Sequence, residues 1–288
     1  MSVYCKLRTL GARCHSPAEF LLAGLRAVYF TARAQSRLET TVRLRDAGMQ
    51  LFLPPRAAGV TRQIYALRGN YEIELRWLRK LVGTGGVAFD IGANVGIYTA
   101  YLSAAVGGLG KVVAFEPFQP AYSRLRLAAG TASAANVAVY PFAIGRSPGH
   151  GEMRESPGDI GSNSVTMRPG AGTIEIRTID QMVAELGLPR LDFIKLDIEG
   201  GELDALRGGL RVIRSHRPTI LVEMNPQAAA AQGSNTRDVF ELLRGLGYSL
   251  ALMTRQGGLN ACLEPPTQLT NMLALPNGSA ATGSLRIH

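Results

Sequence analysis

The sequence predicts an α/β fold built on a doubly wound, mostly parallel sheet. Short apolar runs have the length of buried strands, and helical stretches separate most of them. The runs lie at residues 87–90, 111–115, 137–140, 191–197, 219–223 and 248–253. Alternating strands and helices form right-handed crossovers, which cover both faces of a parallel sheet with helices. With 288 residues, 46% of them hydrophobic and 18% charged, the chain can bury a large core.

Residues 1–69 predict a cap of one helix and one hairpin ahead of the sheet. Ser16-Pro17 is a typical helix start, because it combines a capping side chain with proline at the first position. Phe20, Leu21, Leu25, Val28 and Tyr29 then recur at helical spacing, with Arg26, Arg33 and Arg37 expected on the wetter face. Alternating strands at 41–45 and 49–53 flank the turn Asp46-Ala47-Gly48, and a helix is expected at 70–82.

The main domain is expected to span residues 70–276. Its helices are predicted at 97–105, 121–129, 202–213 and 236–246. Residues 145–177 are rich in Gly, Ser and Pro. This composition predicts an insertion near the pocket mouth, with a strand at 173–176. Residues 277–288 predict a loose tail.

Composition narrows the class of protein. No stretch reaches 18 apolar residues, and no apolar segment precedes a small-residue cleavage site, so neither a membrane span nor a secretory leader is expected. Cys5, Cys14 and Cys262 form no C-x-x-C pair, which disfavours a disulfide scaffold or zinc cluster. The expected location is the cytoplasm.

Charge is concentrated near the start of the chain. The first 60 residues hold nine basic and three acidic residues, a charge of +6 within a total of +9. Such asymmetry can indicate an anionic partner: nucleic acid, a phosphorylated substrate or a lipid surface. The alternative is a compositional bias towards arginine.

A glycine-rich turn follows the first sheet strand. The segment Asp90-Ile91-Gly92-Ala93-Asn94-Val95-Gly96 lets the backbone approach a ligand, and Glu116 ends the next strand, 20 residues after Gly96. A carboxylate in that place can accept both hydroxyls of a ribose, so the pair predicts a nucleoside cofactor. The turn is not the G-x-G-x-x-G that cradles a pyrophosphate. Asp90 instead suits a cationic amino-acid end, which favours S-adenosyl-L-methionine over a nicotinamide cofactor.

Motifs along the chain resemble those of the FkbM-type methyltransferases. In order they are Gly69–Glu72, DIGANVG, KVVAFEPFQP, VYPFAIG, GSNSV, RTIDQMV, LDFIKLDIEGGELDALRGG and PTILVEMN. The resemblance covers about residues 60–250 and is strongest over 85–225. It implies the class I (Rossmann-like) methyltransferase sheet of seven strands in the order 3-2-1-4-5-7-6, with an antiparallel seventh strand at 270–275.

The resemblance also implies how the cofactor is held. Asp90, Gly92, Asn94 and Gly96 would line its methionine end, Glu116 would bind the ribose, and Ala143 and Ile144 would flank the adenine. Tyr71, in the Gly-x-Tyr-Glu segment, is a candidate to close over the cofactor. The implied reaction is O-methylation of a hydroxyl on a sugar, glycan or secondary metabolite.

Carboxylates at the ends of the fourth and fifth strands are the candidate catalytic groups. Asp197 is the first choice for the base that removes the hydroxyl proton, and Glu199 and Glu223 could assist it. The same three could hold a divalent cation, but without flanking histidines this signal is loose and no metal site is assigned. Ser162, Asn163 and Ser164 in the insertion are candidates for choosing the acceptor.

Other classes stay open as alternatives. An NAD(P)-dependent oxidoreductase would need a different glycine loop, and a non-catalytic nucleoside-binding or membrane-surface module would act through residues 1–60. The fourth strand does not end in the Asn/Asp-Pro-Pro-Tyr/Phe that clamps a base amino group, and no cysteine lies near it. Methylation of nucleic acid is therefore disfavoured.

Overall fold

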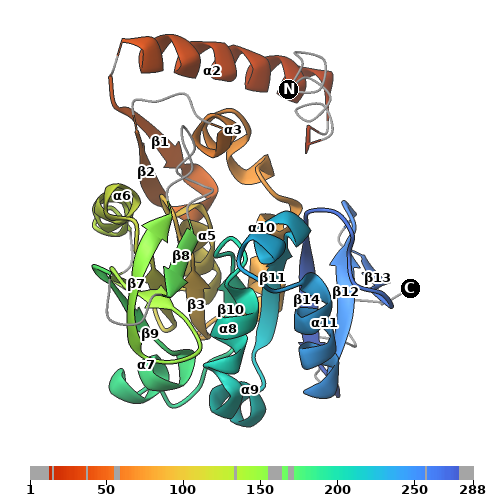
Figure 1. Cartoon of the computed structure of the whole chain (residues 1–288). Coiled ribbons are helices and arrows are strands. Elements are labelled where there is room, and N and C mark those ends of the chain that lie inside the picture. The colour runs from red at the N-terminus through yellow and green to blue at the C-terminus, as the bar shows by residue number, and fades with distance from the viewer. Residues whose placement is uncertain are drawn as a thin grey trace.

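A computed structural model of the chain shows a large mixed sheet with helices on both faces (Figure 1). It describes residues 13–14, 16–36, 38–54, 59–132, 135–154, 164–167 (backbone), 172–256 and 258–278. The main sheet has eight strands in the order β5-β4-β3-β10-β11-β14-β12-β13. Their bounds are β3 Val87–Ile91, β4 Lys111–Phe115, β5 Val137–Tyr140, β10 Phe193–Leu196, β11 Thr219–Met224, β12 Tyr248–Met253, β13 Leu259–Ala261 and β14 Thr270–Pro276.

This sheet confirms the predicted fold class and strand order, with one addition. Strands β3, β4, β5, β10 and β11 run parallel, and β14 is antiparallel to both β11 and β12. Seven strands were expected, but the chain turns back after β12 and adds the short antiparallel strand β13 at the edge. A three-residue strand carries too weak a pattern to be seen in the sequence.

Helices enclose two apolar cores, one on each face of the sheet. One face packs against α4 (Leu78–Val82), α5 (Ile97–Val106) and the cap, and the other against α7, α8, α9 and α11. Those four span Ile179–Glu185, Glu202–Arg207, Leu210–His216 and Thr236–Gly245. Helix α6 (Gln119–Ala129) flanks β5, and α10 (Pro226–Ala231) follows β11. Two helices therefore replace the single one predicted at 202–213, because the chain turns at the glycine pair 208–209.

The cap consists of α2 (Pro17–Gln35), the hairpin of β1 (Thr40–Leu44) and β2 (Met49–Leu53), and α3 (Gly59–Leu67). Ser16 accepts a hydrogen bond from the Glu19 amide, which confirms the predicted helix start. The predicted orientation of α2 is wrong. Its buried residues are Ala23 and Phe30, whereas the aliphatic residues expected to face the core are exposed.

Residues 68–82 form three short helical pieces rather than the one predicted helix. They are η2 (Arg68–Asn70), η3 (Ile73–Arg76) and α4. Glu72 interrupts them with extended backbone, φ −137° and ψ 149°. Its carboxylate accepts hydrogen bonds from Tyr98 and Asn271, and these long-range contacts outweigh the local helical preference.

The insertion forms a second, four-stranded sheet in the order β6-β9-β7-β8. Its strands are β6 (Ala143–Ile144), β7 (Gly149–Arg154), β8 (Ser164–Met167) and β9 (Ile174–Arg177). One strand had been expected there, and β9 corresponds to it. Among the described residues, no helix combines the length and the apolar character that a membrane crossing requires.

Candidate active site

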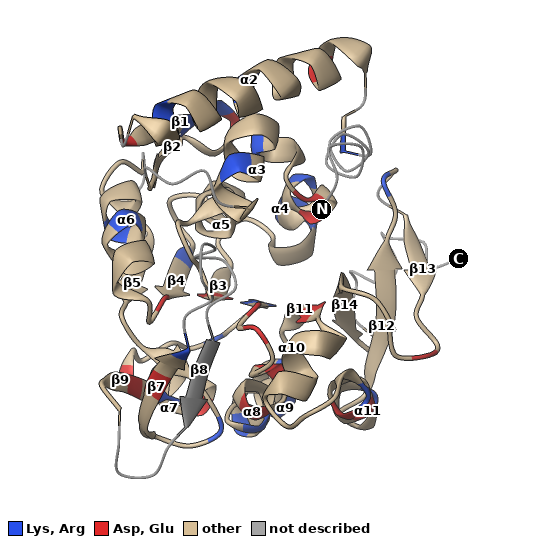
Figure 2. Cartoon of the chain, turned by 45° about the horizontal axis from the view of Figure 1, so that its top comes forward, with Lys and Arg blue, Asp and Glu red and all other residues tan. Residues whose placement is uncertain are grey.

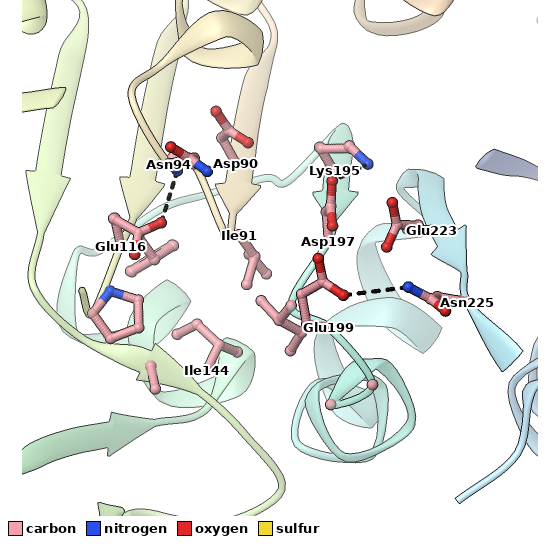
Figure 3. Close-up of a pocket in the computed structure, with 18 of the residues that line it drawn as sticks. Asp90, Ile91, Asn94, Glu116, Ile144, Lys195, Asp197, Glu199, Glu223 and Asn225 are labelled. Atoms are coloured by element: carbon pink, nitrogen blue, oxygen red, sulfur yellow. Dashed lines mark hydrogen bonds and ion pairs between the residues drawn. The ribbon is translucent and has the colours of Figure 1, made fainter. Parts of the chain in front are cut away.

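A cavity of about 640 Å³ lies at the carboxyl ends of β3, β4, β10 and β11. The cap closes one side of it through α3, and the second sheet contributes Met153 and Ile176 on another. The side chains around it converge from both halves of the parallel sheet (Figure 3). This is the edge at which parallel α/β sheets bind ligands, because the strand order reverses there.

The glycine turn brings backbone close to the fourth strand. Gly92 has φ +83°, and a Cβ atom on it would lie 1.8 Å from the Asp197 carbonyl oxygen, so only glycine fits. Asn94 also has a left-handed backbone, with φ 51°. Its side-chain oxygen Oδ1 is buried without a hydrogen-bond partner among the described residues, and it belongs to the pocket lining.

Glu116 is held rigidly at the end of β4. Its Oε2 accepts from the Asn94 amide at 2.7 Å, and its Oε1 accepts from the Phe118 amide at 2.9 Å. Burial raises the pKa of Glu116 to about 7. Each carboxylate oxygen can accept a second hydrogen bond, so both remain usable by a ligand.

A buried lysine is the main feature of the site that sequence reasoning missed. Lys195 pairs in register with Asp90 across β10 and β3, and only 1% of its surface is exposed. Its Nζ lies 3.3 Å from Asp197 Oδ2 and 3.1 Å from Asn271 Oδ1. Burial alone would lower the pKa of Lys195, but the carboxylates of Asp197, Glu72 and Glu223 outweigh it and raise that pKa. A lysine inside an otherwise apolar strand was the available signal.

Glu72 joins the same network from the cap side. The Tyr98 hydroxyl and the Asn271 amide at 2.8 Å both donate to Glu72 Oε2. The ammonium of Lys195 also lies 4.9 Å from the centre of the Tyr98 ring. Residues from β10, α5, β14 and the segment before α4 therefore fix one another, although they are far apart in the sequence.

The three predicted catalytic acids meet at one place. Asp197, Glu199 and Glu223 each have a carboxylate oxygen within 4.8 Å of the others. Asn225 donates to Glu199 Oε2 at 3.3 Å, as Figure 3 shows. Burial and the charge of Asp197 raise the pKa of Glu223 well above its usual value. Lys195 supplies one positive charge beside this cluster, 3.3 Å from Asp197.

Glu202 has the structural role that its place in the first turn of a helix predicts. Its Oε1 accepts from the amides of Ile198 at 3.0 Å and Gly200 at 3.2 Å. These bonds shape the loop that carries Asp197 and Glu199. Glu199 itself has a left-handed backbone, φ 53°, which this loop must hold in place.

The remaining candidates lie around the cavity wall. Ala143 and Ile144 form β6 and line the pocket, and Asp90 is buried with Thr99 donating to it at 2.5 Å. Tyr71 also lines the pocket, with the Arg13 guanidinium 5.4 Å from its ring centre. Ser162 and Asn163 lie outside the described residues. For Ser164 only the backbone is described, as the first residue of β8.

Buried carboxyl groups give stability an unusual pH dependence. Burial raises the pKa of Glu74 and of Glu116 to about 7, and that of Asp90 to about 6. A carboxyl group whose pKa is raised by folding holds its proton more tightly when folded, so its deprotonation favours unfolding. Ligand-free protein should therefore lose stability as the pH rises from about 4.5 to about 7, and the raised pKa of Glu223 should extend this loss above pH 7.

Thermal unfolding measured across this range tests that expectation. Each fully realised shift would contribute on the order of 3 kcal/mol. Glu116→Gln, which cannot ionise, should flatten the fall in melting temperature. A melting temperature that climbs steadily between about pH 5 and pH 7.5 would contradict the expectation.

Comparison of the sequence with known proteins assigns the chain to a family. The family model described as the methyltransferase FkbM domain matches residues 90–250, which is more than half of the chain. The chain belongs to the FkbM methyltransferase family. The match begins at Asp90 in the glycine turn and includes Glu116, Asp197 and Glu223, so most of the cavity lining belongs to the matched region.

Relatives of the FkbM domain include two curated proteins. The chain is 28% identical to the hexuronic acid methyltransferase AglP of Haloferax volcanii over 183 residues, 63% of this chain and 70% of AglP. It is 24% identical to the AMB antimetabolite synthetase AmbE of Pseudomonas aeruginosa over 204 residues, 58% of this chain but 10% of AmbE. The crystal structure of methyltransferase FkbM from Methylobacillus flagellatus KT is 18% identical with a TM-score of 0.41, covering 86% of this chain and 59% of that one.

Proposed function

We propose that the protein is an S-adenosylmethionine-dependent O-methyltransferase whose acceptor is a hydroxyl group of a sugar, glycan or secondary metabolite. The observation that carries the proposal is the acidic lining of the pocket around Glu116. Eight carboxyl side chains and three basic side chains line it. Such a pocket favours a cationic ligand such as a sulfonium, and it disfavours the two negative charges of a dinucleotide pyrophosphate.

The residues present fit this cofactor. Glu116 offers two fixed oxygens for a ribose. The buried Asn94 Oδ1 has no hydrogen-bond partner among the described residues, and a donor group of the ligand could supply one. Asp90, Gly92 and Gly96 would line the methionine end, and Ala143 and Ile144 the adenine. Tyr71 would cover it from the cap side. When bound, S-adenosylmethionine supplies a methyl group on a positively charged sulfur.

Asp197 is the proposed base. Its side chain is 29% exposed, so it is open to an acceptor, whereas one oxygen of Glu223 is buried and has no hydrogen-bond partner in the part of the chain that the structure describes. A hydroxyl bound beside Asp197 would lose its proton to the carboxylate as its oxygen takes up the methyl group. Lys195, 3.3 Å from Asp197, would stabilise the negative charge of the Asp197 carboxylate, and Glu199 with Asn225 would orient the acceptor.

The proposal of a sugar acceptor is supported by the similarity to AglP. AglP is a hexuronic acid methyltransferase, and its similarity to this chain supports a carbohydrate acceptor. The acids around Asp197 favour a neutral hydroxyl there over a second anionic group. Ser162, Asn163 and Ser164 stay candidates for acceptor choice.

Calorimetric titration with S-adenosylhomocysteine tests the cofactor. Wild-type protein should bind it, and Glu116→Ala should weaken binding by at least about 100-fold, because each of the two hydrogen bonds between the carboxylate and the ribose contributes about 1.5–3 kcal/mol. Glu202→Gln, which keeps an oxygen for the Ile198 and Gly200 amides, is the matched control and should bind normally. Binding of NADH without binding of S-adenosylhomocysteine would overturn the proposal.

A further inference from the structure

The outer side of α2 is a continuous apolar stripe. Leu21, Leu25 and Val28 are 65%, 61% and 71% exposed, and Leu22 and Tyr29 beside them are 46% and 52% exposed. Their spacing of three, four and seven residues places all five on one side of the helix. We call these five residues the α2 stripe. No charged residue of α2 lies within it.

The opposite side of α2 attaches the helix to the rest of the cap. Phe30 is buried and stacks on Tyr65 of α3 with 5.2 Å between ring centres. Arg26 donates to the Ala66 carbonyl at 3.4 Å, and Arg33 donates to the Glu39 carbonyl at 2.9 Å. These contacts fix the rotation of α2, so the aliphatic residues of the stripe face away from the protein. Tyr29, at the edge of the stripe, also stacks on Tyr65, with 6.1 Å between ring centres. Figures 1 and 2 show α2 at the outer edge of the molecule.

An exposed stripe of this kind marks a binding surface, since aliphatic side chains gain free energy by leaving water. A standard protein interface has about 20–30 residues on each side, far more than the stripe supplies. An interfacial helix needs only one apolar face, and the stripe runs about 12 Å along α2, from Leu21 to Tyr29. The size of the stripe therefore favours a lipid surface over a second protein.

Charge around the stripe points the same way. Among the described residues, the Arg33 guanidinium lies 5.9 Å from the ring centre of Tyr29 at the stripe's edge. The sequence of the first 60 residues, parts of which lie outside the described structure, carries a charge of +6. Basic groups beside an apolar helix face attract anionic headgroups while the aliphatic side chains enter the acyl boundary. We propose that the α2 stripe binds the protein to the surface of an anionic lipid bilayer.

Cosedimentation of the full chain with lipid vesicles tests the proposal. Wild-type protein should bind vesicles of phosphatidylcholine containing about one-third phosphatidylglycerol, and high salt should weaken that binding. The double variant Leu25→Gln/Val28→Gln should bind at least about tenfold more weakly, because two aliphatic side chains no longer enter the lipid. Its melting temperature and its affinity for S-adenosylhomocysteine should stay unchanged, since both side chains are exposed.

Leu109→Gln is the matched control. Leu109 is 91% exposed in the turn between α5 and β4 and is not part of the α2 stripe, so its replacement should leave vesicle binding unchanged. Absence of wild-type binding, or equal binding by the double variant, would overturn the proposal. Light scattering that shows a dimer, which the double variant converts to a monomer, together with no vesicle binding, would assign the stripe to a second copy instead.

Discussion

Asp197→Asn should lower the rate constant of methyl transfer by about 10²–10⁴-fold, the usual contribution of a positioned base. Asparagine keeps the shape of the side chain and can still accept a hydrogen bond from Lys195, but it cannot take up the hydroxyl proton. Affinity for S-adenosylhomocysteine should change little. Single-turnover kinetics with a methylated product detected by mass spectrometry would measure the effect.

Glu202→Gln is the matched control for the loss of rate in Asp197→Asn. It also removes one buried carboxylate from the same loop, yet its amide oxygen can replace Oε1 as acceptor for the Ile198 and Gly200 amides. We expect its rate to stay within a few-fold of wild type. Equal losses in Asp197→Asn and Glu202→Gln would show that loop structure, rather than proton removal, limits the reaction.

Gly92→Ala should destabilise the fold by more than about 3 kcal/mol, the combined cost of a left-handed alanine and an overpacked contact. The added Cβ would lie 1.8 Å from the Asp197 carbonyl oxygen, which is backbone and has little room to retreat. Because β3 and β10 would have to separate at the edge that carries the cavity, affinity for S-adenosylhomocysteine should fall as well. Chemical denaturation would give the change in the free energy of unfolding.

Gly85→Ala separates the cost of the steric clash from the cost of placing alanine in a left-handed backbone conformation. Gly85 has a similar φ of +77°, but nothing among the described residues lies within 4 Å of a Cβ built on it. This variant should cost only about 1–2 kcal/mol and leave ligand binding intact. If the two variants were equally stable, the close approach of Gly92 to β10 would have no energetic role.

The site residues at the ends of strands were the part of the site that the sequence could predict. Asp90, Glu116, Asp197 and Glu223 each lie at or just beyond the end of an apolar run. Parallel strands bring such ends to one edge, so their convergence follows from the strand pattern alone. Their roles in binding and catalysis stay predictions, which the variants above test.

Lys195, Glu72 and Asn271 were not predicted as site residues, because no local pattern relates them. Glu72 and Asn271 are 199 residues apart, and their hydrogen bond exists only because β14 inserts between β11 and β12. A buried lysine is stable where several carboxylates surround it, and that environment is assembled from four separate elements. The same long-range contacts explain why residues 68–82 do not form one helix.

Periodicity and turn residues determined the α/β class, six of the main strands and the glycine turn, because each depends on residues adjacent in the sequence. The antiparallel strand at 270–275 was implied by the family resemblance. The rotation of α2 was decided only by tertiary structure. Apolar residues lie on two opposite sides of this helix, so its sequence pattern does not select the side that is buried. Phe30 stacks on Tyr65, and Arg26 and Arg33 donate hydrogen bonds to neighbouring carbonyls, and these contacts bury the side that carries Phe30. Local sequence specifies that a helix forms, while contacts from distant elements specify which of its faces meets water.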